Sequence, residues 1–153
     1  MNDREVIAWF DSTLANVLTA DLVDINTQVA WPGMQFDSDS FPADKDWYQP
    51  KIMLGQPSAA ELGPLGQNVV DGFYQVVLYG GTANNESEQV LRDRVYPIVE
   101  AFKRGTTFSG TNPAGQRYCI HCKSSWIFNS DRDTMTARWT VTVRVRFEAY
   151  MDN

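Results

Sequence analysis

Two cysteines and a histidine that lie close together are the residues best suited to chemistry. Cys119, His121 and Cys122 include the only histidine and the only two cysteines of the 153-residue chain. Structural zinc sites take four cysteine or histidine ligands, so this set is too small. The surrounding β pattern directs Cys122 to the opposite side of the strand from the other two. We expect neither a metal site nor a redox pair, because redox cysteines usually lie at a helix N-terminus.

A cysteine–histidine pair for nucleophilic catalysis meets a related objection. Cys119 and His121 share one side of the predicted strand, but residues two apart are about 6.5 Å apart at Cα. No third group that would orient the histidine is identifiable. The sequence also contains neither a phosphate-binding loop motif nor a nucleophile-elbow motif. We therefore expect the protein to be neither an enzyme nor a cofactor binder. Cys119 and His121 are expected to pack as ordinary strand residues.

Four aspartates form the other conspicuous cluster, at positions 37, 39, 44 and 46. A calcium loop combines alternating acids with a glycine at its turn and a bidentate glutamate after it. Both are missing here, and Pro42 interrupts the spacing. The segment from Asp37 to Asp46 is therefore predicted to be a solvated acidic loop.

The charge of the chain is unevenly placed. The formal net charge is -6, yet the first 102 residues carry 15 acidic and 5 basic side chains, and the rest carry 4 acidic and 8 basic ones. Such asymmetry fits an acidic surface that meets a basic one; the alternative is that both segments interleave in the fold. The overall acidity argues against a dedicated nucleic-acid binder. We expect one domain over residues 1–153, with no membrane span and no secretory signal.

Two helices and several strands are predicted to carry these residues. Apolar residues at spacings of three and four predict a helix from Asn2 to about Asp21 and a second one from Glu86 or Ser87 to Phe102. Pro97 should kink the second helix or end its first segment. Strands are predicted over 47–54, at an edge because of Pro50, over 67–79, at the centre, and over 118–128. The fold class is α+β, with two main helices packed on an antiparallel or mixed sheet.

The segment from Thr136 to Tyr150 has the clearest pattern in the chain. Its odd-numbered residues are apolar and its even-numbered residues are mostly polar, which predicts a half-buried antiparallel strand. At about 3.3 Å per residue the strand would span roughly 50 Å. It must therefore bend through a bulge inside one sheet, or run past the domain and offer unpaired backbone groups to a neighbour.

Three arginines, Arg138, Arg144 and Arg146, share the polar side of this strand. In a head-to-tail ring they would meet the acidic surface of the adjacent subunit. The alternative is a solvated strand face whose charges deter aggregation.

The order of these features resembles a known family. A helix leads to the segment VAWPGMQF at 29–36, a glycine-rich loop precedes a helix that ends AFKRGT at 101–106, and a long alternating strand follows. Over about residues 5–150 this resembles the bacteriophage tail terminator family, relatives of the lambda-type tail terminator. The acidic segment 37–46 and the cysteines depart from the family pattern.

The resemblance implies a structural virion protein of the tail or neck, assembled in the host cytoplasm. Its expected form is a hexameric ring that caps the tail tube, stops its polymerisation and connects it to the head. Expected partners are further copies of the chain, the major tail-tube protein and a head-completion or connector protein, and DNA would pass through the ring without sequence-specific binding. Alternatives are a tail-tube or head-completion subunit, or a small ligand-binding or enzymatic module.

Trp31 and Phe36 are predicted to anchor the segment after the first helix, with the core the expected place for Trp31. The loop from Gly80 to Asn85 is predicted to become ordered on docking. The predicted interface residues, toward another subunit or the tail tube, are therefore Arg138, Arg144, Arg146, Trp31, Phe36, Gly80, Asn84 and Asn85.

Overall fold

The computed structural model describes residues 4–56, 58–59, 67–82, 87–133 and 137–152. Helix α1 spans Arg4–Ala20 and helix α2 spans Glu88–Ala101. The strands are β1 (Trp47–Leu54), β2 (Ser58–Ala59), β3 (Gln67–Tyr79), β4 (Thr107–Thr111), β5 (Arg117–Arg132) and β6 (Trp139–Asp152). The fold is α+β, as the sequence predicts.

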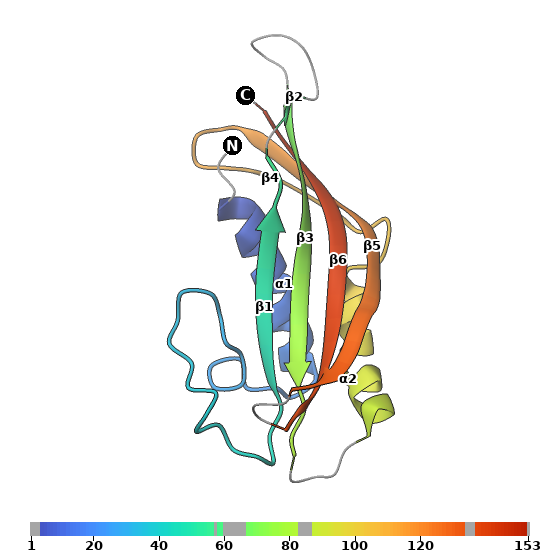
Figure 1. The fold of residues 1–153 in the computed structure, drawn as a ribbon. Helices are drawn as coiled ribbons and strands as arrows, with labels where there is room; N and C mark the ends of the chain where they lie inside the picture. The colour runs from blue at the N-terminus through green and yellow to red at the C-terminus, as the bar shows by residue number, and fades with distance from the viewer. Residues whose placement is uncertain (1–3, 57, 60–66, 83–86, 134–136, 153) are drawn as a thin grey trace.

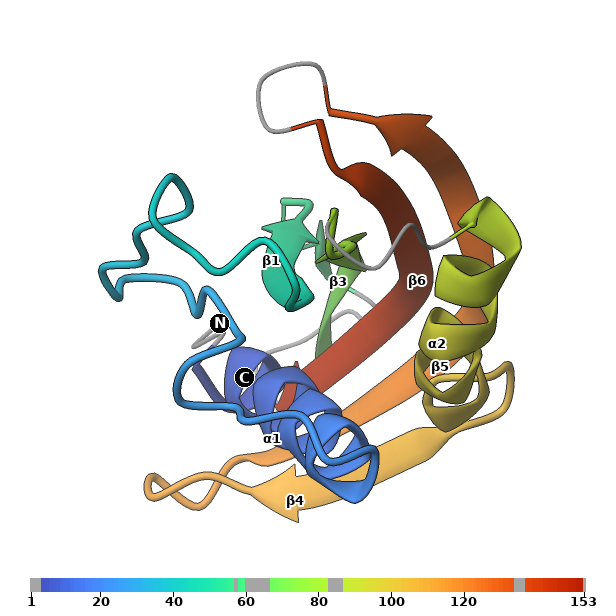
Figure 2. The same cartoon turned by 90° about the horizontal axis from the view of Figure 1, so that it is seen from below.

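All strands join one antiparallel sheet in the order β1–β3–β6–β5–β4, and the short β2 pairs with β3. In Figure 1 the long strands run side by side and both helices lie behind them. Figure 2 shows that the sheet curls around α1. One face of the sheet thus packs on the helices, and we call the other, which neither α1 nor α2 covers, the outer face.

The core lies between the helices and the concave face. The apolar stripe of α1 buries Val6, Phe10, Leu14 and Leu18, and that of α2 buries Leu91, Val95 and Ile98. Phe10 is the centre of an aromatic cluster, with ring centroids 4.6 Å from Phe147 and 4.8 Å from Tyr74. These stripes are the ones predicted from the helical spacing.

Strand β6 lies at the centre of the sheet. It pairs with β3 from Thr140 to Asp152 and with β5 along its other edge. Its backbone therefore has partners on both sides, and the predicted overhang toward a neighbour is wrong. The alternative, a strand that lies wholly inside one sheet, is confirmed. The irregularities are in its partner β5, where the register shifts between Cys122 and Ser124 and between Ile127 and Asn129.

Two predictions about prolines had different outcomes. β1, which contains Pro50, pairs within the sheet only with β3 among the described strands, so its edge position is confirmed. α2 begins at Glu88, next to the predicted start at Glu86 or Ser87, with Ser87 as its N-cap, and it continues through Pro97 to Ala101. The prediction that Pro97 ends a first helical segment is wrong: Ile98 and Phe102 beyond it are fully buried, and this packing favours continuation of the helix.

Candidate interaction surfaces

The outer face of the sheet contains an open hollow of about 640 Å³. Its walls come from four neighbouring strands and from the turn after β1. They consist of Met53, Leu54, Gly55, Asp71, Gly72, Phe73, Ser124, Trp126, Arg144 and Arg146. We call this the arginine–aromatic hollow. Such a volume is in the range that holds a small ligand or an inserted side chain.

Arg144 is held in place at the wall of this hollow. Its guanidinium lies 3.7 Å from the ring centroid of Phe128 and 5.3 Å from that of Phe73, and its Nη2 donates to Gln75 Oε1 at 3.0 Å. Its Nε is buried and has no hydrogen-bond partner among the described residues. Stacking on two rings and the hydrogen bond to Gln75 together fix the orientation of the planar cation.

Arg146 and Arg138 lie in contrasting surroundings. Arg146 is exposed beside the hollow, whereas Arg138 is only 4% exposed. The prediction that all three arginines form one accessible face is therefore wrong for Arg138. The interface role of Arg144 and Arg146 stays a prediction.

The guanidinium of Arg138 binds backbone carbonyls of its own chain. Nη1 donates to Lys45 O at 2.7 Å and to Gly80 O at 3.1 Å, and Nη2 donates to Pro42 O at 2.8 Å and to Phe41 O at 3.5 Å. Burial lowers the pKa of Arg138. These bonds fasten the acidic segment 37–46 to the ends of β3 and β6.

Gly80 also belongs to this internal contact, so its predicted role at a docking loop is wrong. It is buried, its N–H donates to Trp139 O at 2.9 Å, and a Cβ at this position would lie 2.7 Å from a methyl of Leu91. Asn84 and Asn85, predicted for the same loop, lie outside the described residues.

Trp31 and Phe36 pack within the chain. Trp31 lies against the core, and its Nε1 donates to Ile25 O at 2.9 Å, which agrees with the predicted core position. Phe36 is half-buried, with its ring centroid 4.8 Å from that of Trp47 and 5.5 Å from that of Phe41. A contact of either side chain with a neighbour stays a prediction.

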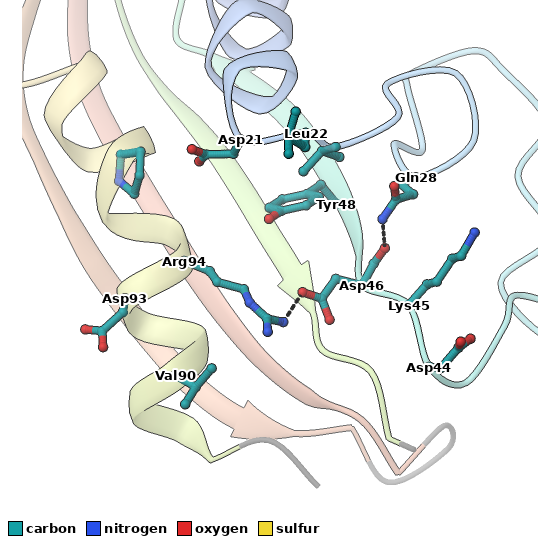
Figure 3. Close-up of a pocket in the computed structure, with 12 residues that line it drawn as sticks. Asp21, Leu22, Gln28, Asp44, Lys45, Asp46, Tyr48, Val90, Asp93 and Arg94 are labelled. Carbon is teal, nitrogen blue, oxygen red and sulfur yellow. Dashed lines mark hydrogen bonds and ion pairs between the residues drawn. The ribbon is translucent and has the colours of Figure 1, made fainter. Parts of the chain in front are cut away.

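A second hollow, of about 670 Å³, opens where α1 ends beside α2 and the start of β1 (Figure 3). Its charged lining consists of Asp21, Asp44, Asp46, Asp93, Lys45 and Arg94, and Leu22, Val23, Gln28, Tyr48, Val90 and Pro97 complete it. Arg94 reaches from α2 to form an ion pair with Asp46. We call this the acidic groove, because four of its six charged lining residues are aspartates.

Leu22 stands at the rim of the acidic groove. It is 94% exposed and its φ is 63°, in the left-handed region. The N–H of Val23 donates to Leu18 O at 2.9 Å and that of Leu22 to Thr19 O at 3.1 Å. These two bonds are those of a Schellman motif, which places Leu22 where glycine is usual.

Cys119 and His121 are closer than the sequence argument allowed. Both half-buried side chains lie on the same side of β5, and Sγ is 3.2 Å from Nε2 of the imidazole. The prediction that their spacing keeps them apart is wrong, because the side chains converge although the Cα atoms do not. Cys122 points to the core, as predicted, where burial raises its pKa to about 12. Among the described residues no three side chains are grouped as metal ligands.

No pattern in the sequence pointed to Leu22 or to the acidic groove. The groove is formed by three segments that are distant in the sequence, so no local sequence pattern predicts it. Leu22 follows the last apolar residue of a helical stripe, at the position where a glycine would have signalled a left-handed turn. Neither helix of the described chain is long and apolar enough to cross a membrane. No protein-family model matches the sequence, and no curated protein matches it.

Proposed function

We propose that this chain is a structural subunit of a bacteriophage tail, a tail terminator that assembles as a ring on the end of the tail tube. The family resemblance of the sequence supports this proposal, and so does the α+β fold with a long alternating strand near its end. In this role the chain contacts further copies of itself, the major tail-tube protein and a head-completion protein. It is a virion component that acts by assembly and carries no catalytic site.

The observation that carries the proposal is the pair of opposed surfaces. The arginine–aromatic hollow opens on the outer face of the sheet, and the acidic groove lies beside the helices that cover the other face. A subunit of a closed ring must present two different surfaces to its two neighbours. Opposite charge on the two surfaces supplies both the orientation and the discrimination between them.

Electron microscopy of virions labelled on this chain tests the proposal. The label is expected at the head–tail junction, and removal of the chain should give tails of uncontrolled length. A label along the tube or at the distal tip would contradict the assignment. A tube subunit would also polymerise into long tubes when purified, whereas a terminator should give closed rings or monomers.

The contact between Cys119 and His121 favours a second candidate, a small ligand-binding or enzymatic module. Its test is the double substitution Cys119→Ala with His121→Ala. Under the tail terminator proposal these variants assemble normal tails, because neither side chain lines the arginine–aromatic hollow or the acidic groove. Loss of a catalytic activity with tail assembly intact would favour the second candidate.

A further inference from the structure

The side chain of Leu22 contributes little to the stability of the isolated subunit. A left-handed backbone conformation disfavours leucine relative to glycine or asparagine, and the side chain is 94% exposed. A large apolar group in that setting contributes almost no burial energy to the monomer. The Schellman motif accounts for the backbone conformation, so it is the exposed leucine side chain at this position that points to a role outside the fold itself.

The charged groups beside Leu22 are predominantly acidic. Asp21 precedes it on the same turn, whereas Asp93, on α2, accepts a hydrogen bond from Gln89 and directs its carboxylate away from Leu22 (Figure 3). Arg94 is engaged with Asp46. The rim therefore presents an apolar projection accompanied by the carboxylate of Asp21.

The arginine–aromatic hollow is the complement of this rim. Met53, Phe73 and Trp126 provide apolar walls, and Arg144 and Arg146 outnumber the single carboxylate, Asp71. The hollow is open to the surface and is large enough for a leucine side chain and the residues beside it. The two surfaces are thus complementary: both include apolar groups, and their excess charges are opposite in sign.

The positions of the two surfaces exclude mutual docking within one subunit. The hollow faces away from the helices, and the groove lies between the ends of α1 and α2 on the helix side of the sheet. One copy can therefore engage two neighbours at once, through its rim on one side and its hollow on the other. Such heterologous contacts form rings when the rotation closes.

We propose that Leu22, with Asp21 beside it, docks into the arginine–aromatic hollow of a second copy of this chain, where Arg146 meets the carboxylate of Asp21. The inference rests on the proposed ring for its context and names the contact between ring subunits. Leu22 supplies the apolar anchor, and the arginines fix its orientation and exclude a hollow-to-hollow pairing by like charge.

Two single substitutions of the full chain test the two sides of the contact. Leu22→Asn removes the anchor and suits the left-handed backbone; Arg146→Glu reverses an exposed charge. Each should weaken self-association at least about tenfold in sedimentation velocity, and Leu22→Asn should not lower the melting temperature.

Met34→Asn and Arg104→Glu, exposed positions outside both surfaces, are the matched controls and should associate as the wild type does. If Arg146→Glu unfolds the subunit, Arg146→Gln takes its place.

Mixing the two variants separates this arrangement from every symmetric one. The Arg146→Glu chain keeps an intact Leu22, and the Leu22→Asn chain keeps an intact hollow. An equimolar mixture should therefore form one good contact and stop at a dimer, which native mass spectrometry would identify as containing one copy of each variant. A mixture that stays monomeric, or that forms full rings, contradicts the proposal.

Other outcomes distinguish this inference from the proposed function. A wild-type chain that stays monomeric at millimolar concentration overturns the self-docking, and so does normal association of both variants. Neither result contradicts the proposed function as a tail terminator. Binding of wild type but not Leu22→Asn to tail-tube protein alone would assign the rim to that partner and overturn the inference. Association that depends on Leu22 in a chain found away from the head–tail junction would leave the inference standing and refute the function.

Discussion

At the residue scale, Arg138 shows how one buried cation organises a segment that has little regular structure of its own. Its four carbonyl partners come from residues 41, 42, 45 and 80, and the ring of Phe41 lies 5.6 Å from its guanidinium carbon. The planar group spreads its five N–H donors over several acceptors, which an ammonium ion cannot match. The acidic segment 37–46 is thereby a fixed part of the fold.

Arg138→Met should destabilise the subunit by about 2–4 kcal/mol, because it leaves buried carbonyls without donors. Urea denaturation gives the free energy of unfolding. Arg146→Met, at an exposed position, is the control and should change it by less than about 0.5 kcal/mol. Equal effects of the two substitutions would show that the carbonyl contacts contribute little.

Asp11 makes the stability of the folded subunit depend on pH, in a direction that follows from its raised pKa. Burial raises the pKa of its carboxyl above the ordinary 3.8, an effect that the hydrogen bond from Tyr74 only partly opposes. The folded state then binds the proton more tightly than the unfolded state. This contribution to stability is full below the ordinary pKa and is lost as the pH rises through the raised value.

Asp11→Asn should therefore stabilise the subunit at neutral pH by about 0.5 kcal/mol, a small effect because the carboxyl is half-exposed and screened by water. The gain should disappear below the ordinary pKa, where Asp11 is protonated in both states. Urea denaturation at the two pH values measures it. A gain that is the same at both would mean that the charge of Asp11 is not its cause.

Alternating polarity located β3 and β6, because side chains on a strand point to opposite faces whatever the tertiary fold, although β6 begins at Trp139 and not at the predicted Thr136. It did not reveal β4 (Thr107–Thr111), whose exposed edge carries no apolar alternation. It also placed Arg138 with Arg144 and Arg146, since parity alone assigns them to one face. Arg138 precedes the first residue of β6 and follows Ala137, whose φ is 59°. A pattern argument holds only as far as the strand does.

At the element scale, neighbouring residues of β6 offer a direct comparison. Val143 is fully buried on the concave face, whereas Thr142 beside it points to the outer face. Val143→Asp should prevent folding, because it places a carboxylate without a partner in the core. Thr142→Asp should leave the chain folded. Far-UV circular dichroism of the two variants would test this, and a folded Val143→Asp chain would contradict the assigned face of β6.

At the scale of the whole molecule, the two surfaces differ in the sign of their charge: the acidic groove has four acidic and two basic residues, and the hollow has two arginines and one aspartate. The early segments supply the carboxylates of the acidic groove, and β6 supplies two arginines of the hollow. The acidic and basic parts of the chain nevertheless interleave in the fold, as one of the two alternatives predicted, because β6 lies beside β3 and Arg138 binds carbonyls of the acidic segment. The residues of each surface come from elements that only the tertiary fold brings together, so the sequence predicted the charges and not the surfaces.

Self-association through these surfaces should weaken as the salt concentration rises, because dissolved ions shorten the distance over which exposed charges attract one another. We expect the dissociation constant to increase by about tenfold between low and high salt. Arg146→Gln should associate more weakly and with a smaller salt dependence. Sedimentation velocity at several salt concentrations gives both quantities. Association that strengthens with salt would show that apolar contacts alone hold the copies together.

The position of β6 also constrains how the chain is made. β1 and β3 form one antiparallel pair and β4 and β5 another, and only β6, the last strand in chain order, joins them. While the ribosome is still producing the earlier strands, β3 and β5 have exposed inner edges that can pair with other nascent chains. The sheet can close only after β6 leaves the exit tunnel, so a chain cut short before Trp139 lacks the strand that joins the two pairs.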